Sequence, residues 1–273
     1  MEQISEMLGQ YRRNTEMFFD DERLEMCRRG ARFKERVYEP PTVKDDTKCA
    51  ICGDEGYRFF WYDGYEYAEE CECHRAVVSL ASIKKAGIAR DMTFDNFFTD
   101  KEFQKSIKTK AEQYTHDGYL AGQWFYIGGQ SGCGKTHICT AILNELIHKG
   151  VECKYMTWKE ESVHLKSIVN NHAEYHERIM ELCQIPMLYI DDFWKTQAGT
   201  SPTQADVNLA FQVLNFRYMN PTKVTIISSE YLTSQLLEID EATAGRIIEK
   251  SRAYQLNIRK DRDKNYRLSG IET

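Results

Sequence analysis

A complete phosphate-binding loop constrains the fold of this chain more than any other feature of its sequence. Residues 129–136 read Gly-Gln-Ser-Gly-Cys-Gly-Lys-Thr and fit G-x-x-x-x-G-K-[ST] at every fixed position. An apolar run at 124–127 precedes the loop, and an apolar-faced helical pattern follows it. A strand, a glycine-rich loop and a helix in this order are what phosphate binding requires. The loop therefore predicts an α/β fold built around a nucleotide site.

The physical chemistry of this loop predicts ATP and Mg²⁺ as its ligands. The glycines let backbone N–H groups converge on the β-phosphate, and the helix N-terminus adds positive potential. We expect Lys135 to reach the β- and γ-phosphates and the Thr136 hydroxyl to bind Mg²⁺. The expected nucleotide-binding residues are Gly129, Ser131, Gly132, Cys133, Gly134, Lys135, Thr136 and His137.

A second apolar run, at 187–190, ends in two carboxylates, Asp191 and Asp192. Strands of a parallel sheet are buried on both faces, and ligands bind beyond their carboxyl ends. We therefore expect Asp191 to lie beside the loop and to hold Mg²⁺, directly or through water. Asp192 is expected to polarise the attacking water, a role often taken by the longer Glu side chain.

Strand and helix patterns alternate around these two motifs, which predicts a parallel sheet flanked by helices. The chain has 273 residues, so one large domain and one smaller domain are expected. We place an N-terminal helical and zinc-binding domain at 1–86, a linker at 87–100 and the ATPase domain at 101–273. The expected strands are 123–128, 152–156, 187–191, 223–228 and 254–258, and the expected helices are 103–114, 135–148, 160–182, 203–217 and 241–250.

Paired cysteines in the N-terminal part predict a structural zinc site. The pairs are Cys49-x2-Cys52 and Cys71-x-Cys73, with glycines and an aromatic-rich segment between them that predicts a small ribbon. Four thiolates suit tetrahedral Zn²⁺ and leave no open position for catalysis. His74 is a rival fourth ligand to Cys73, and a redox pair or unrelated free thiols are the alternatives. Such a module would need its metal to fold.

Charge and hydropathy bear on whether the chain binds nucleic acid, spans a membrane or is secreted. The net charge of −6 excludes a strongly basic nucleic-acid coat, but residues 245–267 carry eight basic and three acidic side chains. This segment is either a site for single-stranded DNA or a solvated face. No apolar run approaches the ~20 residues of a membrane span. The N-terminus also lacks a secretory signal, so a cytoplasmic location without membrane contact is expected.

Taken together, the motifs resemble those of the DnaC/DnaI-like AAA+ helicase loaders, of the phage and prophage type found with Gram-positive hosts. IstB transposition ATPases are close relatives of these loaders. The resemblance covers about residues 45–270 and rests on the phosphate loop, the acidic strand end, the segment at 86–97 and the paired cysteines. It also rests on Ile-Ile-Ser-Ser-Glu at 226–230 and Ala-Gly-Arg-Ile-Ile-Glu at 244–249.

The resemblance implies further site residues. Arg246 matches the arginine finger that reaches the ATP of a neighbouring subunit, and Arg252 is the runner-up. The family usually carries an Asn that orients the lytic water where this chain has Ser228, Ser229 and Glu230. Either Ser229 or Glu230 could substitute for it, or hydrolysis could be slow. The sequence offers no secure sensor 2 arginine.

The function that the resemblance implies is an ATP-dependent loader, which binds a hexameric DnaB-type replicative helicase and places it on single-stranded DNA. It implies self-association through the ATPase domain and an N-terminal region that grips the helicase. The N-terminal helical pattern could equally pack on its own ATPase domain. Two alternatives stay open: an IstB-like transposition ATPase, and an ATP-switched adaptor with little hydrolysis.

Overall fold

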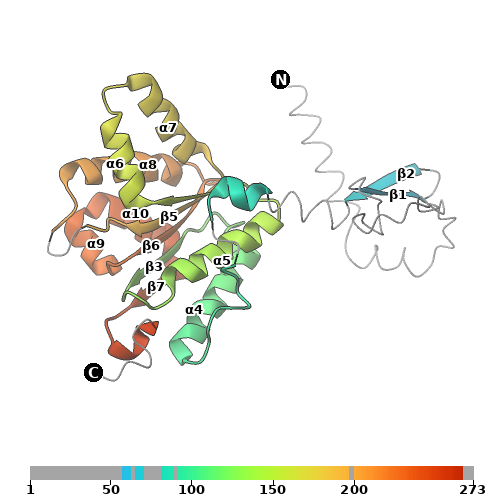
Figure 1. Cartoon of the computed structure of the whole chain (residues 1–273), viewed down its shortest axis with the longest axis horizontal. Helices are drawn as coiled ribbons and strands as arrows, with labels where there is room; N and C mark the ends of the chain where they lie inside the picture. Colours follow the sequence, from blue (N-terminus) through green and yellow to red (C-terminus); the bar gives the residue numbers. More distant parts are fainter. Residues whose placement is uncertain (1–56, 63–64, 71–80, 89–90, 197–199, 267–273) are drawn as a thin grey trace. The chain divides into compact units, whose positions relative to one another are not determined.

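The structure is a computed structural model that describes residues 57–62, 65–70, 81–88, 91–196 and 200–266 (Figure 1). The chain divides into two compact units, Met1–Arg75 and Ala76–Thr273. In the first unit, β1 (Tyr57–Tyr62) and β2 (Tyr65–Glu70) form an antiparallel hairpin. The aromatic ribbon expected from the sequence is thereby confirmed. The zinc-ligand candidates Cys49, Cys52, Cys71, Cys73 and His74 lie outside the described residues.

The second unit is built on a five-stranded parallel sheet, as the alternating pattern predicts. Its strands lie in the order β4-β5-β6-β3-β7 and all neighbours run parallel. The central strand β6 therefore separates β3, which leads into the phosphate loop, from β5, which carries the two aspartates. The strands are β3 (Phe125–Gly129), β4 (Cys153–Thr157), β5 (Met187–Phe193), β6 (Val224–Ser229) and β7 (Gln255–Ile258).

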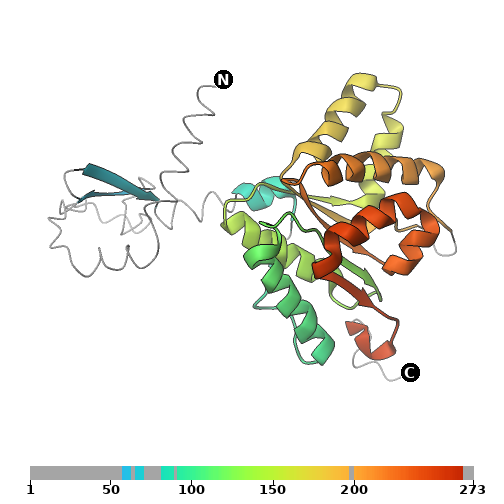
Figure 2. The same cartoon turned by 180° about the vertical axis from the view of Figure 1, so that it is seen from behind.

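Helices cover both faces of this sheet (Figures 1 and 2). One face is covered by α5 (Lys135–His148), which packs against α4 (Glu102–Gln113). On the other face, α8 (Gln204–Met219) packs against α10 (Glu241–Ser251). The unit also contains α6 (Trp158–Ser167), α7 (His172–Gln184) and α9 (Thr233–Ile239), and residues 81–86 are helical. No helix of the described part is both long and apolar enough to cross a bilayer.

One helix prediction was wrong, and one helix was missed. The single helix expected at 160–182 is two helices, because α6 ends at Ser167 and α7 starts at His172. Asn171 caps α7: its side-chain oxygen accepts a hydrogen bond from the Glu174 backbone N–H at 3.5 Å. Asn favours this role because its short amide satisfies the free N–H groups of a first turn. The short helix α9 was not predicted at all.

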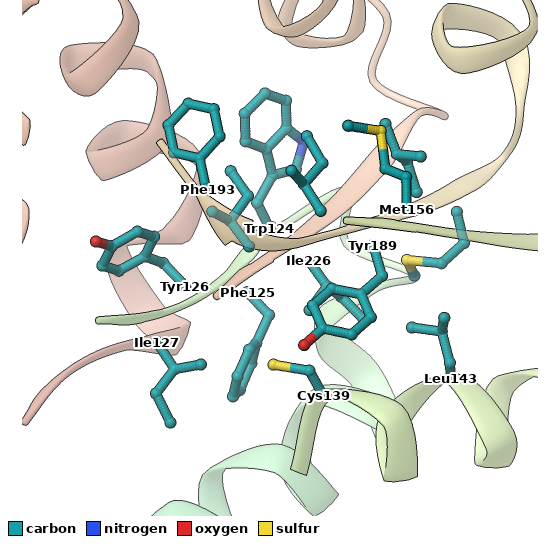
Figure 3. Packing of buried hydrophobic residues seen from close by; sticks show 14 of the residues in the cluster. Trp124, Phe125, Tyr126, Ile127, Cys139, Leu143, Met156, Tyr189, Phe193 and Ile226 are labelled. Atoms are coloured by element: carbon teal, nitrogen blue, oxygen red, sulfur yellow. The ribbon is translucent and has the colours of Figure 1, made fainter. Parts of the chain in front are cut away.

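The core lies on both sides of the sheet, as Figure 3 shows. Every residue of β3 and β6 is buried, which explains their nearly continuous apolar runs. Phe125 and Tyr189 meet Cys139 and Leu143 of α5 on one side, whereas Trp124 and Phe193 lie on the other. The helix that follows the phosphate loop is thereby fixed to the strand that carries the aspartates.

A β-bulge interrupts β5 at its functional end. Ile190 pairs with Ile227 of β6, but the next pair joins Phe193 to Ser229. Three steps along β5 therefore match two along β6, and the extra residue changes which face the following side chain meets. The strand does not end at Asp191 as expected, since pairing resumes at Phe193.

Candidate nucleotide-binding site

The phosphate loop adopts a conformation that depends on glycine. Gly129, Gly132 and Gly134 have φ angles of 107°, 75° and 94°, in the left-handed region that other residues rarely adopt. A Cβ on Gly129 would lie 2.1 Å from the Ile258 carbonyl oxygen, and one on Gly132 would lie 2.0 Å from Asn265 Oδ1. The backbone at Ile258 thus leaves no room for a side chain at Gly129, and a side chain at Gly132 would have to displace Asn265.

Lys135, the first residue of α5, is held inside the loop. Lys135 is only 7% exposed, and its Nζ donates to the carbonyl oxygens of Gly129 and Gln130, both at 2.9 Å. A buried ammonium needs such acceptors. The structure therefore brings the predicted phosphate-binding cation to the concave side of the predicted loop.

Asp191 lies next to Thr136, as expected for two ligands of one cation. The carboxylate is 4% exposed, and its Oδ1 accepts a hydrogen bond from Thr136 Oγ1 at 3.3 Å. Oδ1 also accepts from the Tyr189 hydroxyl at 2.8 Å and from the Ser228 hydroxyl. The Tyr155 hydroxyl donates to Oδ2 at 3.3 Å. The Asp191 carboxylate and the Thr136 hydroxyl are the oxygen ligands that suit Mg²⁺, a hard cation.

Sequence reasoning missed the two tyrosines around this carboxylate. Burial, with the charge of Asp191 adding to it, raises the pKa of Tyr155 and of Tyr189 above the ordinary value. Both phenols therefore stay protonated and can donate to the carboxylate at every physiological pH. The alternation of β4 and β5 was the available signal: Tyr189 is two residues before Asp191, on the same face of its strand.

Asp192 and Glu230, the expected water-orienting residues, meet a common cation. Lys195 Nζ lies 2.9 Å from Asp192 Oδ2 and 3.2 Å from Glu230 Oε1. Ser229 is fully buried, and its hydroxyl donates to the Phe193 carbonyl oxygen at 2.8 Å. Ser228, rather than Ser229, is thus the serine of this strand end that contacts Asp191.

The segment before α4 packs against the first turn of α5. His137 Nε2 lies 3.0 Å from the Thr93 carbonyl oxygen and 2.9 Å from Asn96 Oδ1. The His137 ring meets Phe97 edge-on at 5.3 Å between centroids. Cys133 is buried in the loop, and this burial raises the pKa of its thiol. The thiol therefore stays protonated, consistent with a small residue that has no chemistry of its own.

The C-terminal part of the chain also contacts the loop, which the sequence did not predict. The Tyr266 backbone N–H donates to the Gly132 carbonyl oxygen at 2.9 Å. The Tyr266 ring stacks on Phe98 with 4.8 Å between centroids. The Asp261 N–H donates to Gln130 Oε1 at 3.1 Å. The basic C-terminal segment thus lies against the phosphate loop.

Arg246, the expected finger, packs within its own subunit. Its Nε donates to Asn215 Oδ1 at 2.9 Å and one terminal nitrogen donates to the Ala242 carbonyl oxygen at 2.7 Å. The guanidinium also lies 4.8 Å from the centroid of the Phe211 ring, a cation–π distance. The runner-up, Arg252, is exposed.

Comparison with known proteins identifies the family. The family model described as "IstB-like ATP binding protein" matches residues 76–250. The uncharacterized protein YqaM of Bacillus subtilis is 33% identical over 224 residues, covering 78% of this chain and 70% of the relative. The phage-like element PBSX protein XkdC of the same organism is 30% identical over 263 residues, 91% of this chain and 96% of the relative. The replicative helicase loader DnaC of Escherichia coli is 28% identical over 125 residues, 44% of this chain and 50% of that protein.

Solved structures agree on the fold. A crystal structure of the DnaC helicase loader superposes with a TM-score of 0.52 at 17% identity, over 63% of this chain and 98% of that chain. A replication initiator DnaA bound to AMPPCP and single-stranded DNA gives a TM-score of 0.53 at 18% identity, over 64% and 53%. The resemblance to DnaC-type loaders and to IstB proteins is thus confirmed. The chain belongs to the IstB-like ATP-binding protein family and is a P-loop ATPase of the AAA+ type.

Proposed function

We propose that this chain is a loader that binds a hexameric DnaB-type replicative helicase and places it on single-stranded DNA, using ATP. The observation that carries the proposal is the pairing of Thr136 with Asp191 beside the phosphate loop, in a chain similar to the DnaC helicase loader. This pairing places a hydroxyl and a carboxylate where one magnesium ion can use both.

The nucleotide site assigns a task to each residue. Lys135 leaves the carbonyl oxygens of Gly129 and Gln130 and binds the β- and γ-phosphates of ATP. Thr136 and Asp191 hold Mg²⁺, which supplies charge neutralisation of the phosphates when bound. Asp192 orients the attacking water, and Glu230 assists it. Because Tyr155, Tyr189 and Ser228 already hold Asp191, its carboxylate needs little reorganisation to accept the metal.

Subunits associate through the ATPase domain, so that Arg246 of one completes the ATP site of the next. For this, the guanidinium exchanges Asn215, the Ala242 carbonyl oxygen and the Phe211 ring for the γ-phosphate of the neighbour. Such an exchange is feasible because each of these contacts is worth only ~1 kcal/mol.

Single-stranded DNA binds along the basic C-terminal segment. Arg252, Arg259 and Lys260 are exposed, and within the described part of the chain none of them pairs with an acidic side chain. Exposed cations that are free to meet phosphates are typical of sites that bind single strands without sequence preference. Because the whole chain carries a charge of −6, this affinity is local and sensitive to salt.

The N-terminal region, residues 1–86, contacts the helicase, and residues 87–100 link it to the ATPase domain. In this region Cys49, Cys52, Cys71 and Cys73 bind one structural Zn²⁺, with His74 as the alternative to Cys73. The spacing of the four thiols in the sequence supports this part of the proposal.

The test is co-elution of the full chain with a purified DnaB-type hexamer on a size-exclusion column, followed by delivery of that helicase to single-stranded DNA. We expect the wild-type chain to co-elute and to deliver the helicase when Mg²⁺ and ATP are present. Lys135→Ala removes the cation for the phosphates, so this control should bind labelled ATP at least about 100-fold more weakly and should not deliver the helicase. If the wild-type chain fails to co-elute in any nucleotide state, the loader proposal is wrong.

The family match also favours a second candidate, an ATPase that remodels a transposase on DNA, as an IstB-like protein. An adaptor that binds ATP with little turnover is the third. Stimulation of ATP turnover separates the three. A loader responds to the helicase and DNA, a transposition ATPase responds to a transposase, and an adaptor responds to neither.

A further inference from the structure

Three charged side chains meet beyond the carboxyl ends of β5 and β6. Lys195 lies 2.9 Å from a carboxylate oxygen of Asp192 and 3.2 Å from one of Glu230, so a single ammonium bridges two acids. The side chains of Lys195, Asp192 and Glu230 are 40%, 35% and 40% exposed. The cluster is therefore accessible to solvent, and its ion pairs can open without unfolding the core.

The backbone fixes Lys195 in this bridging position. Asp192 and Trp194 have φ angles of 51° and 58°, and they are the non-glycine residues with positive φ in the described part of the chain. The Lys195 N–H donates to the Asp192 carbonyl oxygen at 2.9 Å, which closes a tight turn. The Trp194 ring is fully buried and stacks on Phe193 with 4.6 Å between centroids.

This turn is strained, and strained backbone at a functional site is typical of segments that change conformation. A buried N–H group without a hydrogen-bond partner adds a second energetic cost to the strain of the two left-handed residues. Trp194 Nε1 is buried without a hydrogen-bond partner among the described residues. Both observations indicate a turn that is stable only while its surroundings hold it.

The ion pairs occupy the atoms that ATP hydrolysis would use. Asp192 Oδ2 already accepts from the Lys195 ammonium, and a carboxylate that shares its charge with an ammonium is a weaker acceptor for the proton of a water molecule. Burial opposes the charge of Lys195, but hydrogen bonds and attraction from Asp192 and Glu230 raise its pKa above the ordinary value. The ammonium therefore stays charged and keeps its hold on both carboxylates.

We propose that Lys195 is a positioning residue that holds Asp192 and Glu230 in a resting arrangement, and that its departure frees Asp192 to orient the attacking water. The inference rests on the role given to Asp192 in the proposed function. In the freed state, the water oxygen bonds to the γ-phosphorus and the bond to the bridging oxygen breaks. ADP leaves with that electron pair, and the water proton passes to Asp192 and then to solvent.

The experiment compares ATP turnover of the full chain, without helicase or DNA, in wild type and variants. Lys195→Met removes the cation and should raise kcat about two- to five-fold, the range that an exposed ion pair allows. KM should not change, because Lys195 touches no phosphate-binding residue. Lys195→Arg keeps the charge and should restore the wild-type kcat. Lys105→Met removes a lysine from another exposed ion pair, with Glu102 on α4, and should leave kcat at the wild-type value.

The outcomes distinguish a failure of the Lys195 hypothesis from a failure of the role proposed for Asp192. Asp192→Asn should abolish turnover both alone and in combination with Lys195→Met. If Asp192→Asn retains full turnover, the role of Asp192 is wrong and the inference falls with it. If Asp192→Asn is inactive but Lys195→Met is no faster than wild type, the inference alone is wrong. An equal rise for Lys195→Met and Lys195→Arg would also reject it, since a lost charge could not then be the cause. The helicase co-elution test is independent of all these results.

Discussion

Asp191 illustrates how much of this site is decided by single side chains. Two tyrosines, a serine and a threonine donate to one nearly buried carboxylate. Hydrogen bonds of this kind fix the orientation of the carboxylate. The sequence predicted Asp191 and Thr136, because the motif names them. It did not predict the donors from β4 and β6, because their proximity follows from strand order.

Arg217 is a second buried charged side chain on which many hydrogen bonds converge, and its partners in the described part of the chain are carbonyl and hydroxyl oxygens rather than a carboxylate. It is fully buried on α8, and burial lowers its pKa to about 9. Its guanidinium donates to backbone carbonyl oxygens near the starts of β5 and β6 and to one hydroxyl. These acceptors belong to Leu182, Cys183, Ile185, Pro186, Val224 and Thr225.

We expect Arg217→Met to lower the free energy of unfolding by ~3–5 kcal/mol, because the acceptors stay buried and lose their donor. Arg217→Lys should cost less, since an ammonium still serves three acceptors. Urea denaturation followed by circular dichroism measures both. The outcome that contradicts this account is a methionine variant as stable as wild type.

At the scale of the element, two glycines with left-handed backbone, one inside the phosphate loop and one outside it, differ in what surrounds them. Gly132 has a φ of 75° and lies against Asn265, whereas Gly150 has a φ of 81° with open space around it. Gly150 ends the turn after α5 and takes no part in the site. Substituting each glycine therefore distinguishes the effect of backbone strain, which both share, from the effect of crowding, which only Gly132 has.

Gly132→Ala should weaken ATP binding at least about tenfold, or ~1.4 kcal/mol, because the methyl group displaces Asn265 and distorts the loop. Gly150→Ala should cost ~1–2 kcal/mol of stability from the left-handed backbone and leave ATP affinity unchanged. Titration with a fluorescent ATP analogue and a thermal melt provide the two readouts. Equal losses of affinity in both variants would show that crowding at Gly132 is unimportant.

The elements themselves were predictable to different degrees. The strands β3, β5 and β6 were recognised because strands buried on both faces form apolar runs, and the helix after the loop because the motif requires it. The break between α6 and α7 was missed, although Asn170 and Asn171 were a visible signal for a cap. The bulge at Asp191 and Asp192 could not be read from periodicity, since it depends on pairing with β6.

At the scale of the whole molecule, the proposed function requires Arg246 of one subunit to complete the ATP site of the next. Arg246→Ala should leave ATP affinity unchanged, because its contacts lie between α8 and α10. The rise of turnover per subunit with protein concentration should disappear, since a finger acts only between subunits. Turnover measured over a range of concentrations tests this.

Arg252→Ala is the matched control for this experiment, because Arg252 is exposed one residue after the end of α10. It should keep the concentration dependence. If Arg252→Ala loses that dependence and Arg246→Ala keeps it, the finger is Arg252, and the packing of Arg246 on Phe211 is purely structural.

The extra residue in β5 has a consequence for which side chains this strand end carries. Asp191 meets α5 through Thr136, whereas Phe193 meets Trp158 of α6 across the sheet. Without the extra residue, the aromatic ring would follow Asp191 directly and would still point to the opposite face, because neighbouring side chains alternate along a strand. The bulge therefore adds one residue with its carboxylate, Asp192, at this strand end, while the side chains of Asp191 and Phe193 keep opposite faces of the sheet.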